Sequence, residues 1–173
     1  MISIISAIGN NNEIGRKNKL LCNLPADMKH FRETTRGHTV IMGQRTFESL
    51  GTGTDGDPGK PLPNRRNIIL TLNKEYKRND VEVVYSLEEL DELLKDTTEK
   101  DEELFIIGGG QIYKLFIEKA DRLYITHVNA EFSDADTYFP TIEESKWQKV
   151  KEEKHELDEK NKYAYSFVEY TKK

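Results

Sequence analysis

The segment LFIIGGGQIY at residues 104–113 decides the fold of this chain. Its apolar run, residues 104–107, has the composition of a buried strand, and three glycines lead from it into residues 110–118, which have the periodicity of a helix. The segment VIMGQRTFES at residues 40–49 repeats this order, with Gly43 between strand and helix. Strands that pass directly into helices favour a largely parallel sheet covered on both faces.

The same alternation of strands and helices extends outward in both directions. Runs rich in Ile, Val and Tyr predict strands at residues 2–8, 39–42, 67–72, 81–84, 104–107, 122–128 and 163–170. Apolar periodicity predicts helices at residues 25–34, 44–49, 87–95 and 110–118. The first helix begins with Pro25, the third has the capping box Ser86-x-x-Glu89, and residues 158–162 have the composition of the turn of a terminal hairpin.

The length of the chain, 173 residues, predicts one domain with a sizeable core. No apolar run approaches the roughly 18 to 20 residues that cross a membrane, and the first residues, MISIISAIG, lack the basic region and the cleavage site of a signal peptide. Cys22 is the one cysteine, which excludes an internal disulfide and a multi-cysteine zinc site and favours a reducing compartment. We expect a soluble, cytoplasmic monomer with no bound metal and no membrane partner.

The net charge of -5 arises from 26 basic and 31 acidic residues that are interspersed along the chain. They form no basic stripe of the kind that neutralises a phosphate backbone, so nucleic acid is not an expected partner. Two segments, GTGTDGDPGK at residues 51–60 and DTTEKDEE at residues 96–103, are predicted to be solvated loops. We expect no functional role for the first of them.

Asp27 is the first candidate for chemistry, because it lies in the first turn of a predicted helix. It shares one face of that helix with Phe31 and Thr34, at spacings of four and seven residues. An acid in a first turn can simply interact with the helix dipole. A partly desolvated carboxylate beside Met28 and Phe31 would instead have a raised pKa, hold an amidine-like edge by two hydrogen bonds and assist protonation near neutral pH.

The two strand-to-helix turns are candidate phosphate sites. Glycine lets the backbone approach a pyrophosphate, whose charge then meets a helix N-terminus, although glycine can also serve only to make a tight turn. The turn at residues 108–110 is not the Rossmann GxGxxG, because Gln111, Ile112 and Tyr113 stand where a further glycine is needed. At the other turn, Arg45 can reach a phosphate or can be a solvated charge. Two such turns in one small chain favour a dinucleotide.

Together these three segments resemble the dihydrofolate reductase family in order and in spacing over nearly the whole chain. Further matches are Ile14-Gly15, Asn18, Pro61-Leu62-Pro63 followed by Arg65, NIIL at residues 67–70, YITH at 124–127 and DTYFP at 136–140. The resemblance implies one domain with a central, mostly parallel, eight-stranded twisted sheet, a C-terminal antiparallel hairpin and about four flanking helices. It also implies NADPH-dependent reduction of dihydrofolate to tetrahydrofolate for one-carbon metabolism, and binding of antifolate inhibitors.

On the substrate side, the resemblance implies that Asp27 hydrogen-bonds the pterin, with Thr126 behind it and Leu20 in a loop that closes on the substrate. Arg65 would grip the carboxylate of the glutamate tail. The other implied substrate contacts are Ile5 and Ile107 through their backbone carbonyls, and Ala7, Met28, Phe31, Leu50, Leu62 and Tyr113. Asp27 is expected to be the one ionisable side chain near the pterin, so that a water entering under the loop of residues 9–24 protonates N5.

On the cofactor side, the resemblance implies that the nicotinamide lies beside Thr46 and Tyr113 and the pyrophosphate on Gly109 and Gly110. The full set of implied cofactor contacts is Ala7, Ile14, Gly15, Asn18, Gly43, Gln44, Arg45, Thr46, Leu70, Thr71, Leu72, Ile107, Gly108, Gly109, Gly110, Gln111, Ile112 and Tyr113.

The chain departs from the family pattern in two places. Cys22 stands where most members have a tryptophan, and we expect it to be a small buried hydrophobic residue rather than a reactive thiol. Gln44, Leu72 and Gln111 stand where basic or hydroxyl side chains commonly grip the 2′-phosphate of the cofactor. NADPH is nonetheless expected rather than NADH, with Arg45, and Lys74 as a second candidate, supplying positive charge.

Two other functions fit parts of the pattern. A reductase of riboflavin synthesis has the same fold and cofactor but acts on a ribosylated pyrimidine, and the combination of Asp27, Phe31 and Arg65 favours folate over it. A binding module without catalysis is the alternative from another class, with catalysis lost at the Cys22 change. Asp27, Thr46 and the glycine turn argue against this module only weakly, because binding needs the same groups.

Overall fold

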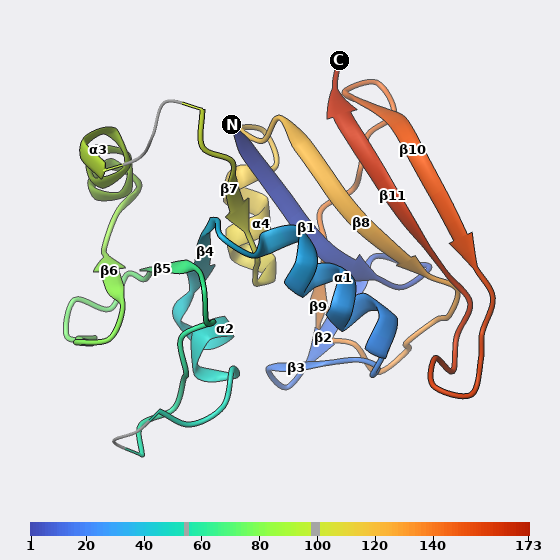
Figure 1. The fold of residues 1–173 in the computed structure, drawn as a ribbon, viewed down its shortest axis with the longest axis horizontal. Helices are drawn as coiled ribbons and strands as arrows, with labels where there is room; N and C mark the ends of the chain where they lie inside the picture. Colours follow the sequence, from blue (N-terminus) through green and yellow to red (C-terminus); the bar gives the residue numbers. More distant parts are fainter. Residues whose placement is uncertain (54–55, 98–100) are drawn as a thin grey trace.

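The central element of the computed structural model, which describes residues 1–53, 56–97 and 101–173, is the strand β1 (Ile2–Ile8) (Figure 1). It pairs in parallel with β7 (Leu104–Ile106) on one side and with β8 (Arg122–Val128) on the other. All three strands are rich in Ile, Leu and Val, as expected for parallel strands that are buried on both faces. The segment that begins at Leu104 therefore lies in the middle of the fold.

The main sheet has eight strands in the order β10-β11-β8-β1-β7-β4-β5-β6. Beyond β7, the parallel strands are β4 (Thr39–Gly43), β5 (Arg66–Leu70) and β6 (Glu82–Val84). Beyond β8, β11 (Tyr165–Lys172) and β10 (Trp147–His155) are antiparallel and form the terminal hairpin. The predicted mostly parallel eight-stranded sheet with an antiparallel C-terminal pair is confirmed.

Four helices accompany the sheet, each within two residues of its predicted bounds: α1 (Pro25–Thr35), α2 (Gln44–Glu48), α3 (Leu87–Thr97) and α4 (Gly110–Phe116). The capping box before α3 is present, because the N–H of Glu89 donates to Oγ of Ser86 at 3.1 Å. The return bond differs from the usual pattern, since Oε2 of Glu89 accepts from the N–H of Tyr85 at 2.8 Å rather than from that of Ser86.

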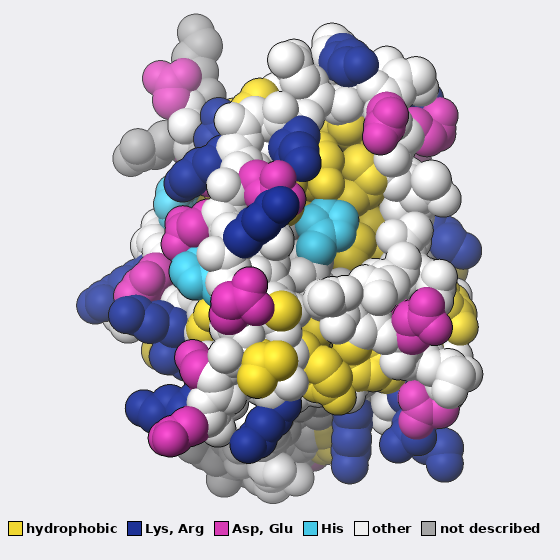
Figure 2. All heavy atoms as spheres, turned by 90° about the vertical axis from the view of Figure 1, so that its right-hand side faces the viewer, with side chains coloured by type: hydrophobic (Ala, Val, Ile, Leu, Met, Phe, Trp, Pro, Cys, Tyr) yellow, Lys and Arg dark blue, Asp and Glu magenta, His cyan; other side chains and the backbone are white. Residues whose placement is uncertain are grey.

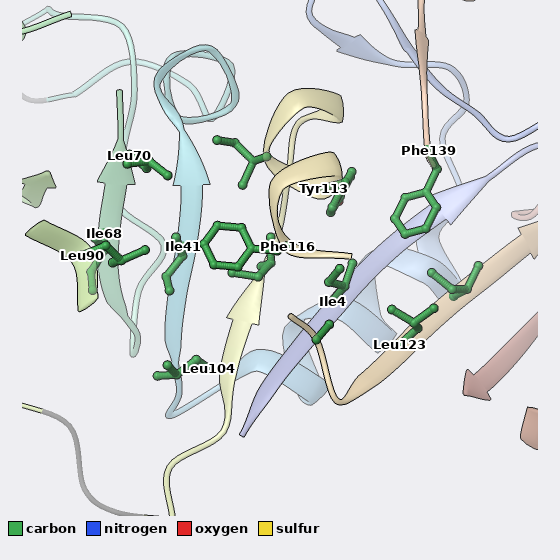
Figure 3. Close-up of a cluster of buried hydrophobic side chains, with 14 of the residues drawn as sticks. Ile4, Ile41, Ile68, Leu70, Leu90, Leu104, Tyr113, Phe116, Leu123 and Phe139 are labelled. Atoms are coloured by element: carbon green, nitrogen blue, oxygen red, sulfur yellow. The ribbon is translucent and has the colours of Figure 1, made fainter. Parts of the chain in front are cut away.

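Alternation along the strands divides the core between the two faces of the sheet. Ile4 and Ile8 of β1 point into a cluster that also contains Leu90 of α3 and Phe116 of α4 (Figure 3). Ile5 points to the opposite face, where its buried cluster meets Phe31 of α1. Helix α1 therefore covers one face of the sheet, and α3 and α4 cover the other. Figure 1 shows α1 in front of the sheet and α4 behind it.

A second, three-stranded sheet was not predicted from the sequence. It consists of β2 (Glu13–Arg16), β3 (Lys19–Leu20) and β9 (Thr137–Tyr138), in the order β3-β2-β9. Strands of two to four residues are too short to show an alternating pattern. This small sheet joins the loop after β1 to the segment after β8.

The predicted acidic loop at residues 96–103 is partly wrong. Helix α3 extends to Thr97, and residues 98–100 lie outside the described part of the chain. Glu102 and Glu103 are not free in solvent, because Oε1 of Glu103 accepts from the hydroxyl of Ser3 at 2.5 Å and Glu102 accepts from the N–H of Thr39 at 3.2 Å. These carboxylates bind the starts of β1 and β4.

One edge of the main sheet is β10, where only Trp147 is buried. Figure 2 views this side of the molecule and shows basic and acidic side chains interspersed over it. Charged side chains on an edge strand discourage pairing with another chain. Within the described ranges, no helix is long and apolar enough to cross a membrane.

Candidate active site

Asp27 lies in the first turn of α1, which begins at Pro25 after the extended residue Leu24. Its Oδ1 accepts a hydrogen bond of 2.6 Å from the hydroxyl of Thr126, a buried residue of β8. The structure therefore brings together two residues that are 99 positions apart in the chain, as the family resemblance implies. Proline at the helix start and the strand pairing of β8 fix the two backbones between which this bond forms.

The surroundings of Asp27 favour its protonated form. Burial raises the pKa of its carboxyl, and this effect outweighs the opposite effects of the hydrogen bond from Thr126 and of nearby His30. The ionisation of Asp27 is thereby moved toward neutral pH. A carboxyl group with a raised pKa can hydrogen-bond a bound ring and favour the addition of a proton to that ring.

A cavity opens beside Asp27, between α1 and the loop that follows β1. Five of the predicted site residues line it: Ala7, Ile14, Leu20, Asp27 and Met28. The other lining residues are Ile8, Gly9, Glu13, Leu21, Cys22, Leu24, Val128 and Phe132. An apolar lining with few polar groups is typical of a site for a flat organic ligand. Leu20 lies at the exposed rim of this cavity.

Glu13 is a second carboxylate in the lining of this cavity, in addition to Asp27. Glu13 is 3% exposed, and its carboxylate accepts from the N–H of Asn11 at 2.7 Å and from the N–H of Phe132 at 2.9 Å. Burial acts to raise the pKa of Glu13, but these hydrogen bonds leave it below the usual value. The carboxylate therefore fastens the loop after β1 to the segment after β8.

Sequence reasoning missed Glu13. The available signal was an acid two residues after Asn11 in a short polar loop, where a carboxylate can accept backbone N–H groups. The same two segments also meet at Asp136, whose Oδ2 accepts from the N–H of Lys17 at 2.9 Å and whose own N–H donates to the carbonyl of Gly15 at 3.0 Å. These bonds hold the loop at residues 11–17, on the N-terminal side of Leu20.

Cys22 is half-buried and faces the same cavity. Burial raises the pKa of its thiol, and the nearby charge of Asp27 raises it further. A thiol with a raised pKa is a poor nucleophile at neutral pH. This agrees with the expectation of a small hydrophobic residue.

The two strand-to-helix turns lie against each other, because the N–H of Gly43 donates to the carbonyl of Gly108 at 2.9 Å. A Cβ added to Gly109 would lie 3.3 Å from the hydroxyl of Thr46, so glycine allows this approach. Gly43 and Gly109 are also the residues before α2 and α4, and neither helix has a side-chain cap. The first N–H groups of two neighbouring helices are therefore available to phosphate oxygens.

The turn also positions Tyr113 of α4. Its hydroxyl donates to the carbonyl of Ile5 at 2.9 Å, and its ring packs on Phe139 with centroids 4.9 Å apart. The carbonyl of Ile5 retains a second lone pair for another donor. Ile107 is only partly buried, and its N–H donates to the carbonyl of Ile41, which holds the end of β7 beside β4.

An outer wall of partly buried apolar side chains continues the site away from Asp27. Phe31, Leu50 and Leu62 pack against the buried cluster around Ile5. Arg65 lies at the end of this wall, with its guanidinium 5.8 Å from the ring centroid of Phe31. The wall therefore ends in a positive charge.

Three groups orient the guanidinium of Arg65. It donates to the hydroxyl of Thr35 at 2.8 Å, to the carbonyl of Pro63 at 2.8 Å and to the carbonyl of Arg32 at 3.3 Å. Burial lowers the pKa of Arg65, and the neighbouring charges of Arg32 and Arg36 lower it further. A positive cluster of this kind favours an anionic ligand group.

The residues at the expected 2′-phosphate region contact one another. Oε1 of Gln44 accepts from the hydroxyl of Thr71 at 2.8 Å, and Nε2 of Gln44 donates to Glu48 at 2.9 Å. Leu72 is 89% exposed. Nearby, Nδ2 of Asn18 donates to the carbonyl of Arg45 at 3.0 Å.

The remaining predicted cofactor residues surround this region. Gly15 pairs with Leu20 in the small sheet, Leu70 and Ile112 are buried in the core, Gly110 is buried and Gln111 is exposed. Among the described residues, no group of three or more His, Cys, Asp or Glu side chains could hold a metal ion.

Comparison with known proteins agrees with this geometry. The family model described as dihydrofolate reductase matches residues 1–172. Dihydrofolate reductase type 3 of Salmonella typhimurium is 42% identical over 97% of this chain and 96% of its own, and dihydrofolate reductase of Bacillus subtilis is 42% identical over 100% and 95%. The structure of dihydrofolate reductase from Enterococcus faecalis complexed with NADP(H) and RAB-propyl superposes with a TM-score of 0.85 at 36% identity, over 99% of this chain and 96% of that one. The chain belongs to the dihydrofolate reductase family.

Proposed function

We propose that this protein is an NADPH-dependent dihydrofolate reductase that converts dihydrofolate to tetrahydrofolate. The observation that carries this proposal is the buried carboxyl of Asp27, which is bonded to Thr126 and faces a mostly apolar cavity. A donor-rich, positively polarised ring edge is the complement of such a group. The pterin ring of dihydrofolate has this edge, with an amino group beside a ring N–H.

The substrate then extends from Asp27 along the apolar wall. The amino group of the pterin would also reach the carbonyls of Ile5 and Ile107, while the aminobenzoyl group would lie between Phe31, Leu50 and Leu62. Arg65 would pair with the carboxylate of the glutamate tail. Three of the five N–H groups of Arg65 donate to Thr35, Pro63 and Arg32, and these bonds fix the plane of the guanidinium. The other two N–H groups would bind the carboxylate.

The cofactor site fits a dinucleotide, because a Cβ at Gly109 would fill the space at Thr46 and the first turns of α2 and α4 have no side-chain caps. Gly109, Gly110 and Thr46 would bind the pyrophosphate, with Ala7, Ile14 and Tyr113 beside the nicotinamide. NADPH supplies the hydride when it is bound. Arg45 is the exposed basic residue in the first turn of α2 and would attract the 2′-phosphate.

The residues of the chain must also promote protonation of the pterin at N5. Asp27 would polarise the ring, and its raised pKa matches this task near neutral pH. The loop that carries Leu20 would exclude bulk water yet admit a single water to N5. Glu13 is not a proton donor in this scheme, because two backbone N–H groups hold its carboxylate ionised.

Further parts of the proposal concern the setting of the enzyme. We infer that it acts in the cytoplasm as a monomer, with dihydrofolate and antifolate inhibitors as its small-molecule ligands. Interspersed surface charges support the absence of a nucleic-acid partner.

The test is the loss of reduced-nicotinamide absorbance when purified protein is given dihydrofolate, with NADPH and NADH in parallel and with Asp27→Asn as the comparison. We expect consumption with NADPH, and a rate of hydride transfer that falls roughly 10²- to 10⁴-fold in Asp27→Asn at neutral pH and recovers partly in acid. Consumption of a ribosylated aminopyrimidine instead would identify the reductase of riboflavin synthesis. A rise in melting temperature with dihydrofolate, but no turnover with either cofactor, would identify a binding module.

A further inference from the structure

The loop of residues 51–60, of which residues 51–53 and 56–60 are described, is fastened to the protein by one arginine. Arg78 lies in the segment between β5 and β6. One terminal nitrogen of its guanidinium donates to the carbonyl of Pro58 at 2.8 Å, and the other donates to the carbonyl of Gly59 at 3.2 Å. A single planar group thus holds two consecutive peptide carbonyls of the loop.

Asp80 fixes the plane of this guanidinium. Its two carboxylate oxygens accept from Nε of Arg78 at 2.9 Å and from Nη2 at 2.7 Å, and the side chain of Arg78 is only 10% exposed. The hydrogen bonds between the two side chains raise the pKa of Arg78 and lower the pKa of Asp80, so both are charged at neutral pH. The side chain of Asp80 is 41% exposed, but the bidentate geometry and the largely buried guanidinium still define the arrangement better than a fully solvated ion pair does.

The loop packs against the ring of Phe47 in α2. The guanidinium of Arg78 lies 5.0 Å from the centroid of this fully buried ring. Gly59 has a φ of +101° and touches the same ring, because a Cβ at this position would lie 2.6 Å from two ring carbons. We call Arg78, Asp80, Gly59 and Phe47 the Arg78 clamp.

The loop that the clamp holds connects two residues of the outer wall, Leu50 and Leu62. The chain enters the loop directly after Leu50 and leaves it two residues before Leu62, and the N–H of Gly59 donates to the carbonyl of Gly51 at 2.7 Å. Leu62 has a separate anchor, because its N–H and carbonyl both bond the side chain of Asn67, at 2.9 and 3.0 Å. Leu50 is joined to the clamp directly, because its N–H donates to the carbonyl of Phe47 at 2.9 Å and its neighbour Gly51 accepts from Gly59.

We propose that Arg78 is a positioning residue for the outer substrate wall. By holding the loop on Phe47 it sets the place of Leu50, and through it the width of the space for the aminobenzoyl-glutamate part of the substrate. The inference rests on the proposed function, which supplies that occupant. This proposal gives the loop of residues 51–60 a role that the sequence did not suggest. It also makes the affinity for the aminobenzoyl-glutamate part of the substrate depend on Arg78, a residue outside the outer wall itself.

The experiment compares Arg78→Ala with Arg66→Ala as a matched control. Arg66 makes a similar bidentate pair with Glu82, at 2.6 and 2.8 Å, and it has no part in the clamp. For each variant, kcat, KM and melting temperature are measured with dihydrofolate and with a methyl dihydropterin that has no aminobenzoyl-glutamate tail. For Arg78→Ala we expect KM for dihydrofolate to rise about tenfold, while kcat and both constants for the tailless pterin stay at wild-type values. For Arg66→Ala we expect a lower melting temperature alone.

Two further variants keep the test decisive if Arg78→Ala does not fold. Arg78→Lys keeps the charge but can hold only part of the fork geometry, so KM for dihydrofolate should lie between those of wild type and Arg78→Ala. Gly59→Ala keeps Arg78 intact but forces the loop off Phe47, so it should raise the same KM. A KM for dihydrofolate at the wild-type value in these variants, or an equal rise for the tailless pterin, would overturn the inference. Failure of wild-type protein to turn over dihydrofolate would instead overturn the proposed function.

Discussion

The hydroxyl of Thr126 donates a hydrogen bond of 2.6 Å to Oδ1 of Asp27, and this bond joins helix α1 to the strand β8 beside the cavity that Asp27 lines. It satisfies one oxygen of a carboxyl that lines a mostly apolar cavity. Burial still raises the pKa of Asp27, so the ionised form is held at a cost in stability. The relationship between these two residues therefore links the chemistry of the site to the stability of the fold.

Asp27→Asn should raise the free energy of unfolding at neutral pH. A carboxyl with a raised pKa in the folded state contributes its full stability below its unfolded pKa, which is about 4, and loses it as the pH rises through the folded value. Asparagine does not titrate and can still accept from Thr126. Thermal unfolding across the pH range should show a gain for the variant at neutral pH that shrinks in acid; a loss at neutral pH would mean that ionised Asp27 makes net favourable contacts.

Arg65→Ala should weaken folate binding by about 1.5 to 3 kcal/mol, because a charge-assisted pair is lost. A pterin without the glutamate tail should bind as it does to wild type. Titration calorimetry with both ligands measures the difference. Equal weakening for the two ligands would show that Arg65 acts on the pterin end of the site, through Thr35 and α1, rather than on the tail.

Glu13→Gln should destabilise the protein by about 1 to 3 kcal/mol, because an amide cannot accept at both positions and leaves the N–H of Asn11 or of Phe132 unpaired. The pKa of Glu13 is lowered, so the stability that it contributes is present above its unfolded pKa and is lost as the pH falls through the folded value. Denaturant unfolding should show a gap between wild type and variant that narrows in strong acid. A gap of the same size at every pH would exclude ionised Glu13 as its cause.

Gln44→Arg should strengthen discrimination in favour of NADPH. The neutral amide of Gln44 is engaged by Thr71 and Glu48, so a guanidinium in its place would add a positive charge at the expected 2′-phosphate region. KM for NADPH should fall and KM for NADH should stay the same. If KM falls for both NADPH and NADH, the new charge acts on the pyrophosphate, which both cofactors contain.

Elements with a strong local pattern could be predicted from the sequence. Residues 2–8 and 122–128 match β1 and β8, because both are long apolar strands bounded by turn residues. Pro25 and the capping box at Ser86 correctly predicted the starts of α1 and α3, because both are local signals for a helix N-terminus. The implied meeting of Asp27 and Thr126 came from the family resemblance, since no local pattern specifies a contact between residues so far apart.

Other features depend on contacts that a linear pattern does not contain. Glu13 and Arg78 both look like ordinary surface charges in the sequence. Glu13 becomes a buried anchor and Arg78 a partly buried one only because a distant backbone segment supplies the partners of each. The strands β2, β3 and β9 form for the same reason, through pairing rather than through propensity. The roles of the individual site residues are predictions that the variants described above test.

The position of β1 in the main sheet has a consequence for how the chain folds during synthesis. Ile2 pairs with Leu104, and Ser3 pairs with Arg122, so both neighbours of β1 leave the ribosome more than a hundred residues after it. Until then this apolar strand has no partner within the sheet, which slows folding and exposes the nascent chain to aggregation. The strand β1 is therefore enclosed only after β7 and β8 have both been made, and nascent chains that end before β8 should need a chaperone to stay in solution.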